Sequence, residues 1–569
     1  MDRVQRWIDR RGYLWAYRAV AALGVLSIVS ALVPASRRQL TTVGELMPAF
    51  APAVATAATV LAGAALLVVA GGLRRRKRRA WWAALALGVS SAVLHLVKGL
   101  DVEEAGLSLV VCVLLVATRR QFSGAPDPRP GRLLLVRGLG AGAIVLAAGS
   151  AVVVADRDGF ARPPGVAAVV AHAALGLVGI TGPVGYSSLA TSRLVGSVLL
   201  GLGAVLAVVL LREMLRPGQA DGLLDNEQEQ QVRRLLAEHG EVDSLGYFAL
   251  RADKSVVFSA SGKAAVSYRV VSGVALASAD PLGSVDAWPG AVDAWHRRCR
   301  EQAWIPAVLG ASEQGATVYR RELGLDALEL GDEAVVELAE FTMQGRAMRG
   351  VRQAVTRMGR AGVVVQVDRI VDLREEVGAL RDDVEAWRDG PVERGFSMAL
   401  GRFADHRDPE AVLVRASNQH GQLLGALSFV PWGRHGLSLD VMRRSPGAEN
   451  GLVEAMVVAL LEAAPGLSVQ RVSLNFAVFR SVFDRGSRIG AGPVLRMWHR
   501  VLLGASKFWQ IESLYRANAK YRPLWEPRFL CFAEARDLPR VAVAALLAEA
   551  FIQRPHWRLR RDRRDGTQL

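Results

Sequence analysis

Long apolar runs are concentrated in the first 212 of the 569 residues, and this distribution limits the folds that the chain can adopt. Five runs come close to the roughly 20 residues that a helix needs to cross a bilayer. They lie at about 14–33, 50–72, 80–97, 133–155 and 194–211. A sixth run, Ala105–Ala117, can cross if it includes its flanking residues. The sequence therefore predicts a transmembrane domain of about six helices at 1–216 and excludes an ordinary soluble enzyme.

Basic residues between these runs predict the orientation of the helices. One arginine-rich cluster lies at 74–79 and another at 119–132, whereas the loop near 98–104 is acidic. Because cytoplasmic loops are enriched in Lys and Arg, we expect both clusters to face the cytoplasm. Six crossings then place everything after Arg212 in the cytoplasm. A seventh apolar run, Val166–Thr181, is accordingly expected to be re-entrant or to lie at the membrane surface.

The residues after the membrane domain are numerous enough for two further domains. Short strands, an amphipathic helix and another strand are expected between 255 and 309, and the same order is expected between 411 and 476. This repeated order predicts two α+β domains, at 217–385 and 386–552, with a basic tail at 553–569.

Charge and cysteine content restrict the partners of these domains. Residues 218–390 carry a net charge of −8, whereas residues 471–569 carry +11. A basic block in a chain with membrane helices indicates a polyanionic partner, either anionic lipid or nucleic acid. Three cysteines cannot form a disulfide framework or a structural zinc cluster, and no two histidines have metal-ligand spacing. No metal and no cofactor are expected.

Two acyltransferase patterns occur at positions that do not suit them. The pattern Arg-x-x-Gly-x-Gly, which binds the pyrophosphate of acetyl-CoA, lies at 137–142, inside an apolar run. In the loop at 443–451, where such a pattern belongs, Glu449 would repel pyrophosphate. His435 and Asp440 have a spacing known from glycerolipid acyltransferases, but residues five apart on a strand face opposite sides. Acetyl-CoA is therefore not expected as a substrate.

Two other features are better candidates for a functional site. Asp440 and Arg443 lie at the end of a predicted strand, where an acid and a base can hold an ammonium group or a carboxyl ester; an ordinary surface ion pair is the alternative. The segment 507–529 interleaves aromatic and basic side chains, which suits stacking on bases and contact with phosphates. Its alternative is a partly buried amphipathic helix that ends in a proline-rich turn.

Several stretches resemble the aminoacyl-phosphatidylglycerol synthase family, of the multiple peptide resistance factor type. They are SLDVMRR (438–444), ENG (449–451), RVSLNFAVF (471–479), DPLG (280–283), MRGVRQAVTRMGRAG (348–362) and FWQIESLYRANAKYRPLWEPRFL (508–530). The resemblance extends over roughly residues 240–550 and is strongest to the membrane-anchored region that is fused to lysyl-tRNA synthetase in actinobacteria. It implies that a polytopic α-helical membrane domain is followed by tandem acetyltransferase-like (GNAT-like) α+β domains.

The resemblance also implies a reaction. Members of the family transfer an aminoacyl group, here most simply lysyl, from aminoacyl-tRNA to phosphatidylglycerol at the cytoplasmic membrane face. The product lowers the negative charge of the membrane and gives resistance to cationic antimicrobial peptides. The expected partners are aminoacyl-tRNA, phosphatidylglycerol and the lipid bilayer, and a homo-oligomer is compatible with this reading.

The motifs that carry the resemblance assign roles to particular residues. Asp440 is expected to bind the substrate amino group, Arg443 to hold the ester or the lipid phosphate, and Lys520 to face the tRNA acceptor end or the developing oxyanion. Further residues are expected to bind substrate: Asn450, Glu454, Asn475, Lys507, Glu512, Tyr515, Tyr521 and Arg522.

Two alternatives remain open from the sequence. One is a synthase that transfers alanyl or another aminoacyl group, and the other is a non-catalytic lipid-binding or translocating membrane protein. No synthetase domain accompanies these residues, so we expect the charged tRNA to come from another protein.

Overall fold

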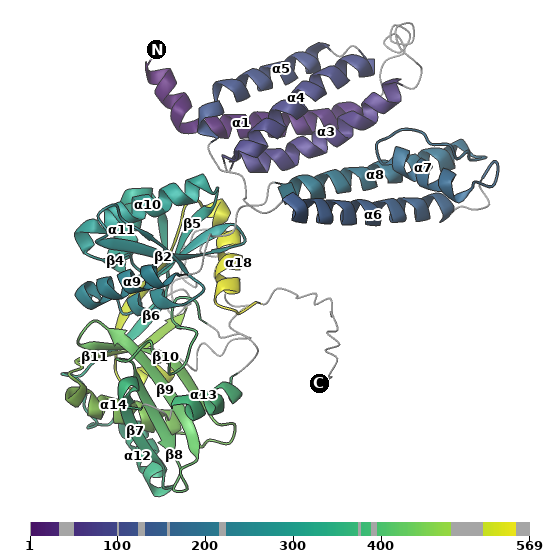
Figure 1. The fold of residues 1–569 in the computed structure, drawn as a ribbon. Helices are drawn as coiled ribbons and strands as arrows, with labels where there is room; N and C mark the ends of the chain where they lie inside the picture. Colours follow the sequence, from purple (N-terminus) through teal and green to yellow (C-terminus); the bar gives the residue numbers. More distant parts are fainter. Residues whose placement is uncertain are drawn as a thin grey trace, which may run out of the picture. The chain divides into compact units, whose positions relative to one another are not determined.

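The computed structural model describes residues 2–32, 51–74, 76–99, 102–122, 131–155, 160–214, 224–373, 377–388, 395–478 and 516–552. The contacts divide the chain into two compact units (Figure 1). The first contains residues 1–219, which are helical, and is assigned residues 300–304 as well; the second contains residues 220–299 and 305–569 and is built on a large sheet.

Helices are present at every apolar run that the sequence predicted to cross the membrane. They are α1 (Asp2–Leu32), α3 (Ala51–Arg74), α4 (Arg78–Gly99), α5 (Val102–Ala117), α6 (Gly131–Ala155) and α8 (Leu189–Met214). Three stretches within them are long and apolar enough to cross a membrane: Gly12–Ser30, Val136–Ala155 and Leu189–Met214. The chain thus has the helices of a membrane protein, while the number of crossings stays a prediction. Helix α7 (Val166–Gly176) has 11 residues, too few to cross a bilayer.

Helices α1 and α3 approach each other at a pair of glycines. A Cβ atom at Gly24 would lie 2.9 Å from the carbonyl oxygen of Gly63, and one at Gly63 would lie 2.8 Å from that of Gly24. Small residues permit such close packing, which is a common basis for helix association in membranes. Helices α4 and α5 are joined by Trp81, whose indole Nε1 donates to the carbonyl oxygen of Leu115 over 2.8 Å.

The second unit is organised by one 12-stranded sheet with the order β1-β2-β3-β5-β12-β6-β11-β10-β9-β8-β7, and β4 pairs with β2 off this path. The strands are β1 (Ser255–Phe258), β2 (Ala264–Val271), β3 (Val274–Ser278), β4 (Leu282–Gly283), β5 (Ile305–Ala311), β6 (Asp326–Glu337), β7 (Val364–Arg369), β8 (Val412–Ser417), β9 (Leu423–Trp432), β10 (Gly436–Arg444), β11 (Arg471–Val478) and β12 (Leu524–Phe532). The predicted α+β fold class is confirmed.

Two parallel strand pairs give the sheet its repeated character. Strands β3 and β5 are parallel and are connected through α10 (Trp288–Glu301), and strands β10 and β11 are parallel and are connected through α14 (Leu452–Ala463). Every other pairing in the sheet is antiparallel. Both parallel pairs coincide with the helix–strand repeats that the sequence predicts, because a parallel connection needs a crossover element.

Strand β12 joins the two halves of this sheet. It pairs with β5 on one side and with β6 on the other, although it follows them by about 200 residues. The sequence indicated a partly buried helix or a nucleic-acid-binding segment in this region. The described part is instead a short helical turn at 516–519 and then the strand. The domain boundary at 385/386 remains a prediction.

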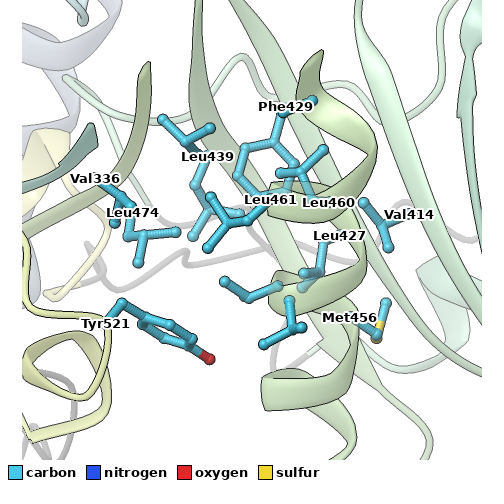
Figure 2. Close-up of a cluster of buried hydrophobic side chains, with 14 of the residues drawn as sticks. Val336, Val414, Leu427, Phe429, Leu439, Met456, Leu460, Leu461, Leu474 and Tyr521 are labelled. Atoms are coloured by element: carbon cyan, nitrogen blue, oxygen red, sulfur yellow. The ribbon is translucent and has the colours of Figure 1, made fainter. Parts of the chain in front are cut away.

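Helices cover both faces of the second half of the sheet. Helices α12 (Arg349–Arg360) and α14 pack with the strands into a buried cluster that includes Leu427, Phe429 and Leu439 (Figure 2). On the opposite face, α13 (Val377–Ala386) and the segment 395–404 enclose a second cluster with Leu413, Ala426 and Val441. Of the candidate site residues, Asp440, Arg443 and Asn475 lie on strands β10 and β11 between these two layers.

Candidate functional site

The parallel strands β10 and β11 stop pairing in the middle of the sheet. Their register pairs Gly436 with Arg471, Leu437 with Val472 and Ser438 with Ser473, and no pair follows. Each strand is irregular just beyond that point. In β10 the register shifts between Leu439 and Val441, and in β11 it shifts between Ser473 and Phe476. These shifts leave Asp440 and Asn475 at the place where the two strands separate.

The bulge at Asp440 changes which side of the sheet the rest of β10 faces. Leu437 and Leu439 belong to the buried cluster beneath α12 and α14, whereas Val441 belongs to the cluster on the α13 side. In a regular strand these three residues would share one face. One extra residue reverses the alternation, as expected for a β-bulge. Asp440 and Arg443, three residues apart, are thereby both directed to the α13 side.

The carboxylate of Asp440 is anchored by a backbone amide. Its Oδ1 accepts a hydrogen bond of 2.8 Å from the amide nitrogen of Leu400, and the residue is half-buried. A carboxylate held in this way is oriented by the segment 395–404 rather than by its own strand. No sequence pattern indicated Leu400, because the group that binds Asp440 is a backbone amide and lies 40 residues away.

Asn475 is held in the left-handed backbone region and joins both strands to the same segment. Its φ is +71°, a conformation that asparagine tolerates better than most residues. Its side-chain Nδ2 donates to the carbonyl oxygen of Leu439 over 3.0 Å and to that of Met398 over 3.4 Å. This amide therefore spans the gap between β10 and β11 beside Asp440.

Arg443 is buried and directed at helix α13. Its Nη1 donates to the carbonyl oxygen of Val384 over 2.9 Å and lies 3.8 Å from the Glu385 carboxylate, and its side chain is 8% exposed. The sequence had indicated that Asp440 and Arg443 lie at the end of a strand. Strand β10 instead continues through Arg444, so both residues lie within it. The contacts described above join Asp440 to Leu400 and Arg443 to Val384, which lie in different segments.

Lys520 and Glu454 form an ion pair on the other face, at the first turn of α14. Lys520 Nζ lies 2.6 Å from Glu454 Oε1. Burial acts to raise the pKa of Glu454, but hydrogen bonds from Lys520 and from its own backbone amide, together with the charges of Lys520 and Arg357, outweigh burial and hold this pKa below its usual value. The lysine and the glutamate that the resemblance selected separately are thus in direct contact.

The neighbouring predicted residues differ in accessibility. Tyr521 is 5% exposed and is part of the buried cluster beneath α14 (Figure 2). Burial and, after it, the Glu454 charge raise the pKa of its hydroxyl well above the usual value. Arg522 and Asn450 are exposed, and the carbonyl oxygen of Asn450 accepts a hydrogen bond from Arg357. Lys507, Glu512 and Tyr515 lie outside the described residues.

Arg528, one of the cations that the sequence placed among possible phosphate contacts, has a structural role instead. It is 2% exposed and forms ion pairs with Glu333 and Asp243, two carboxylates that are also buried. Its Nη2 also donates to the Ser244 hydroxyl over 2.6 Å. These contacts fix β12 against the first half of the sheet and leave no accessible guanidinium for a ligand.

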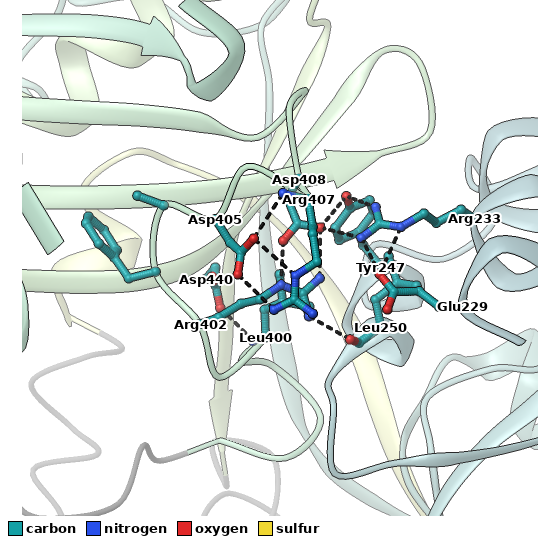
Figure 3. A network of polar contacts seen from close by, with 12 residues as sticks. Glu229, Arg233, Tyr247, Leu250, Leu400, Arg402, Asp405, Arg407, Asp408 and Asp440 are labelled. Carbon is teal, nitrogen blue, oxygen red and sulfur yellow. Dashed lines mark hydrogen bonds and ion pairs between the residues drawn. The ribbon is translucent and has the colours of Figure 1, made fainter. Parts of the chain in front are cut away.

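The segment that binds Asp440 is itself fixed by a polar network (Figure 3). Asp408, 2% exposed, accepts hydrogen bonds from Arg402, Arg233 and the Tyr247 hydroxyl. Arg402 also donates to the carbonyl oxygen of Leu250 over 2.8 Å. Bidentate arginine–carboxylate contacts are rigid. Sequence inspection missed this network, because its members are spread over about 180 positions and form no local motif.

No group of three His, Cys, Asp or Glu side chains in the described ranges is arranged to hold a metal ion. The expectation that no metal or cofactor is needed remains an expectation. The described residues offer a carboxylate and a carboxamide at a break in the sheet, a buried arginine on the α13 side and a paired lysine beside α14. Such a set can bind an ammonium group and polarise an ester carbonyl.

Comparisons with known proteins identify a family that this chain matches. Residues 233–532 match the family model described as phosphatidylglycerol lysyltransferase, C-terminal. The chain is 53% identical over 344 residues to the lysylphosphatidylglycerol biosynthesis bifunctional protein LysX of Mycobacterium tuberculosis, covering 60% of this chain and 29% of that protein. It is 51% identical over 357 residues to the LysX protein of Mycobacterium marinum, covering 62% and 32%.

These curated relatives are much longer than the region matched, so the chain spans about a third of their length or less. Among solved structures, L-PGS from Bacillus licheniformis aligns with a TM-score of 0.50 and 21% identity, covering 58% of this chain and 98% of that one. This structural likeness concerns the fold and agrees with the tandem α+β architecture that the sequence predicted.

Proposed function

The chain belongs to the phosphatidylglycerol lysyltransferase family, and on this premise we propose that it transfers an aminoacyl group from aminoacyl-tRNA to a glycerol hydroxyl of phosphatidylglycerol. The hydroxyl oxygen attacks the ester carbonyl, a tetrahedral intermediate forms, and the terminal ribose oxygen of the tRNA leaves with a proton. One ester replaces another, so little net driving force is required. Bringing the two substrates together supplies most of the acceleration.

The break between β10 and β11 is the observation that supports this proposal at the level of residues. It places the Asp440 carboxylate beside the Asn475 amide, with both held by the segment 395–404. In the proposed reaction Asp440 binds the α-ammonium group of the aminoacyl substrate. A carboxylate that is already oriented loses little freedom when it binds, so the ester carbonyl is positioned for attack.

Arg443 and Lys520 have different roles in this proposal. Because Arg443 is buried against α13, it acts as a positioning residue whose contact with Val384 keeps the second half of β10 in place. Lys520 is 44% exposed beside Glu454 and is available to the acceptor end of the tRNA or to the developing oxyanion. A pre-positioned cation of this kind stabilises the charge that develops in the transition state.

Both substrates and the membrane helices indicate where the reaction occurs. Phosphatidylglycerol resides in the bilayer and aminoacyl-tRNA in the cytoplasm, so we place the second unit on the cytoplasmic side of the cell membrane. The net charge of +11 over residues 471–569 attracts both polyanions. Lysyl is the aminoacyl group that we propose, since the names of the relatives specify lysylphosphatidylglycerol.

Lipid analysis tests the proposal directly. The full chain is expressed in a host that lacks aminoacylated lipids, and the extracted lipids are examined by mass spectrometry. We expect lysyl-phosphatidylglycerol, and we expect its formation by purified protein and charged tRNA to be abolished by ribonuclease. An alanyl product would retain the reaction and change the amino acid. No new lipid from folded protein supplied with charged tRNA would contradict the proposal and favour a lipid-binding or translocating protein.

A further inference from the structure

The segment 395–404 is held from two sides, and only one of them belongs to the proposed site. Toward the site, its backbone binds the side chains of Asp440 and Asn475. On the other side its backbone binds Glu549, the residue that follows helix α18 (Leu538–Ala548). The chemistry of the proposed reaction does not by itself explain this second contact.

Both carboxylate oxygens of Glu549 bind the beginning of the segment. Its Oε2 accepts a hydrogen bond of 2.6 Å from the amide nitrogen of Phe396. Its Oε1 accepts hydrogen bonds from the amide nitrogen and the hydroxyl of Ser397, over 3.2 and 2.7 Å. The carbonyl oxygen of Glu549 also accepts from the amide of Gly395. Because hydrogen bonds to a carboxylate are stronger than those between neutral groups, these contacts fix the position of residues 395–397.

Helix α18 does not account for a buried carboxylate at this position. The C-terminal end of a helix carries a partial negative charge, which disfavours a carboxylate there. Glu549 is also only 8% exposed, and burying a charge costs free energy unless hydrogen bonds compensate for it. The side-chain hydrogen bonds described above come from the segment 395–404, so Glu549 serves that segment rather than its own helix.

The support for Glu549 is the first half of the sheet. Buried side chains of α18 form one cluster with side chains of β3, β5 and β12, and the ring of Phe396 lies in the same cluster. Arg251, which precedes β1, donates to the carbonyl oxygens of Gly395 and Ala399 and so adds a second anchor. Closely packed interiors of this kind deform little, so the beginning of the segment rests on a rigid base.

A displacement at the beginning of the segment is passed on to the site. Met398 and Ala399, the two residues between Ser397 and Leu400, are both bound through their carbonyl oxygens. Three residues of chain span at most about 11 Å, and little freedom is left when each of them is bound. The amide of Leu400 then determines the direction of the Asp440 carboxylate.

We propose that Glu549 is a positioning residue for aminoacyl transfer, which sets the place of the Leu400 amide and through it the direction of the Asp440 carboxylate. This inference rests on the proposed function, because the direction of Asp440 matters for the rate only if Asp440 binds the substrate. The network around Asp408 holds the segment beyond Leu400, so this amide lies between two anchors (Figure 3). Glu549 is the anchor that couples the first half of the sheet to a site in the second half.

Kinetics of the full chain test this role. The protein is placed in nanodiscs that contain phosphatidylglycerol and is supplied with lysyl-tRNA. Glu549→Ala removes both accepting oxygens, and kcat/KM should fall roughly 10- to 100-fold, as expected when a reacting group is displaced by about 1 Å. Glu549→Gln keeps one accepting oxygen but directs an NH₂ group at one of the donors, so its kcat/KM should fall at least about fivefold. The glutamine variant replaces the alanine variant if the latter does not fold.

A double-mutant cycle separates positioning from a general loss of structure. In the Asp440→Asn background no carboxylate remains to be directed. Adding Glu549→Ala there should lower kcat/KM by no more than about threefold further. A role in folding alone would lower kcat/KM by the same factor in both backgrounds.

Hydrogen exchange measured by mass spectrometry follows the segment independently of catalysis. In Glu549→Ala the amides of 395–404 should exchange at least about tenfold faster than in the unaltered chain. Arg540→Gln is the matched control, because Arg540 lies in the first turn of the same helix and donates to the carbonyl oxygen of Ser272. It should destabilise α18 and leave both kcat/KM and exchange in the segment within about twofold of the unaltered chain.

Several results would overturn the inference. They are an unchanged kcat/KM in folded Glu549→Ala, equal losses in both Asp440 backgrounds, an equal loss in Arg540→Gln, and a loss of activity without faster exchange in the segment. Normal formation of aminoacyl lipid by Glu549→Ala would leave the reaction established and refute the positioning role. If the unaltered chain formed no aminoacyl lipid, the proposed function would be refuted and the catalytic part of this inference with it, whereas the exchange rates would still show whether Glu549 holds the segment.

Discussion

Lys520 Nζ lies 2.6 Å from Glu454 Oε1, and this contact joins the start of helix α14 to the segment that precedes strand β12. The two residues are 66 positions apart in the chain. Glu454 lies in the first turn of α14, where the helix dipole favours a negative charge. The pair is partly exposed, so water screens it, and the ammonium remains accessible to a ligand.

This exposure leads to the first prediction. Lys520→Gln should lower kcat/KM for lipid aminoacylation by roughly 10- to 100-fold, because a charge-assisted hydrogen bond to the substrate is lost. It should change the unfolding free energy by less than about 1 kcal/mol, as is typical of exposed ion pairs. Steady-state kinetics and thermal unfolding measure the two effects. Glu454→Gln, which keeps the ammonium, is the control; an equal kinetic loss in both variants would mean that the ion pair, not the lysine alone, is required.

Asp440→Asn separates charge from hydrogen bonding at the proposed amino-group site. Asparagine can still accept the hydrogen bond from the Leu400 amide, so the fold should be retained. Loss of the negative charge should raise KM for aminoacyl-tRNA or lower kcat, with kcat/KM falling about 100-fold. Asp383→Asn, at an exposed position on α13, is the matched control and should leave the rate unchanged. A fully active Asp440→Asn enzyme would exclude Asp440 as the ammonium ligand.

The left-handed backbone at Asn475 gives a prediction about stability. Both Asn475→Gly and Asn475→Ala lose the amide contacts with Leu439 and Met398. Only alanine also places a Cβ atom in the left-handed region, which costs about 1 kcal/mol or more. The midpoint of thermal unfolding should therefore decrease in the order unaltered chain, glycine variant, alanine variant. An alanine variant as stable as the glycine variant would show that this backbone conformation is not retained.

Lys254 gives a prediction about pH. It is fully buried, its ammonium contacts Ser278, Phe248 and the ring of Phe396, and burial lowers its pKa from 10.5 to about 7. Between these values the unfolded chain holds a proton at Lys254 that the folded chain has released. Stability attributable to Lys254 should therefore rise as the pH increases from 7 toward 10.5 and stay constant below 7.

The variant Lys254→Met should remove this rise. Unfolding free energies of the two proteins should be measured at several pH values from about 7 to 9.5. They should differ most near pH 7, where releasing the proton of Lys254 costs the unaltered chain most stability. Lys263→Met, at an exposed position, is the control and should follow the unaltered chain. Parallel curves for the unaltered chain and Lys254→Met would show that Lys254 stays protonated in the folded protein.

Local patterns were sufficient for much of the fold. Short strands were expected after residue 255, and β1, β2 and β3 are present there, because β-branched and apolar residues are bounded by turn residues. The sequence did not reveal β6 or β12. Strand β12 contains Arg528 and Glu526, and charged residues are predicted to be exposed when their partners are not known. The partners of Arg528 are Glu333 and Asp243, almost 200 and 285 positions away.

The sequence by itself determined the separation into a membrane part and a sheet-based part and the α+β class, and its family motifs selected Asp440, Lys520 and Glu454 as candidates. These follow from composition, periodicity and motifs, which are local properties. Only the tertiary structure decided the direction of side chains. One extra residue in β10 turns Arg443 into the α13 layer, and the pairing of β12 between β5 and β6 brings Lys520 to Glu454. Strand register and long-range pairing depend on contacts between residues far apart in the chain, so no local pattern encodes them.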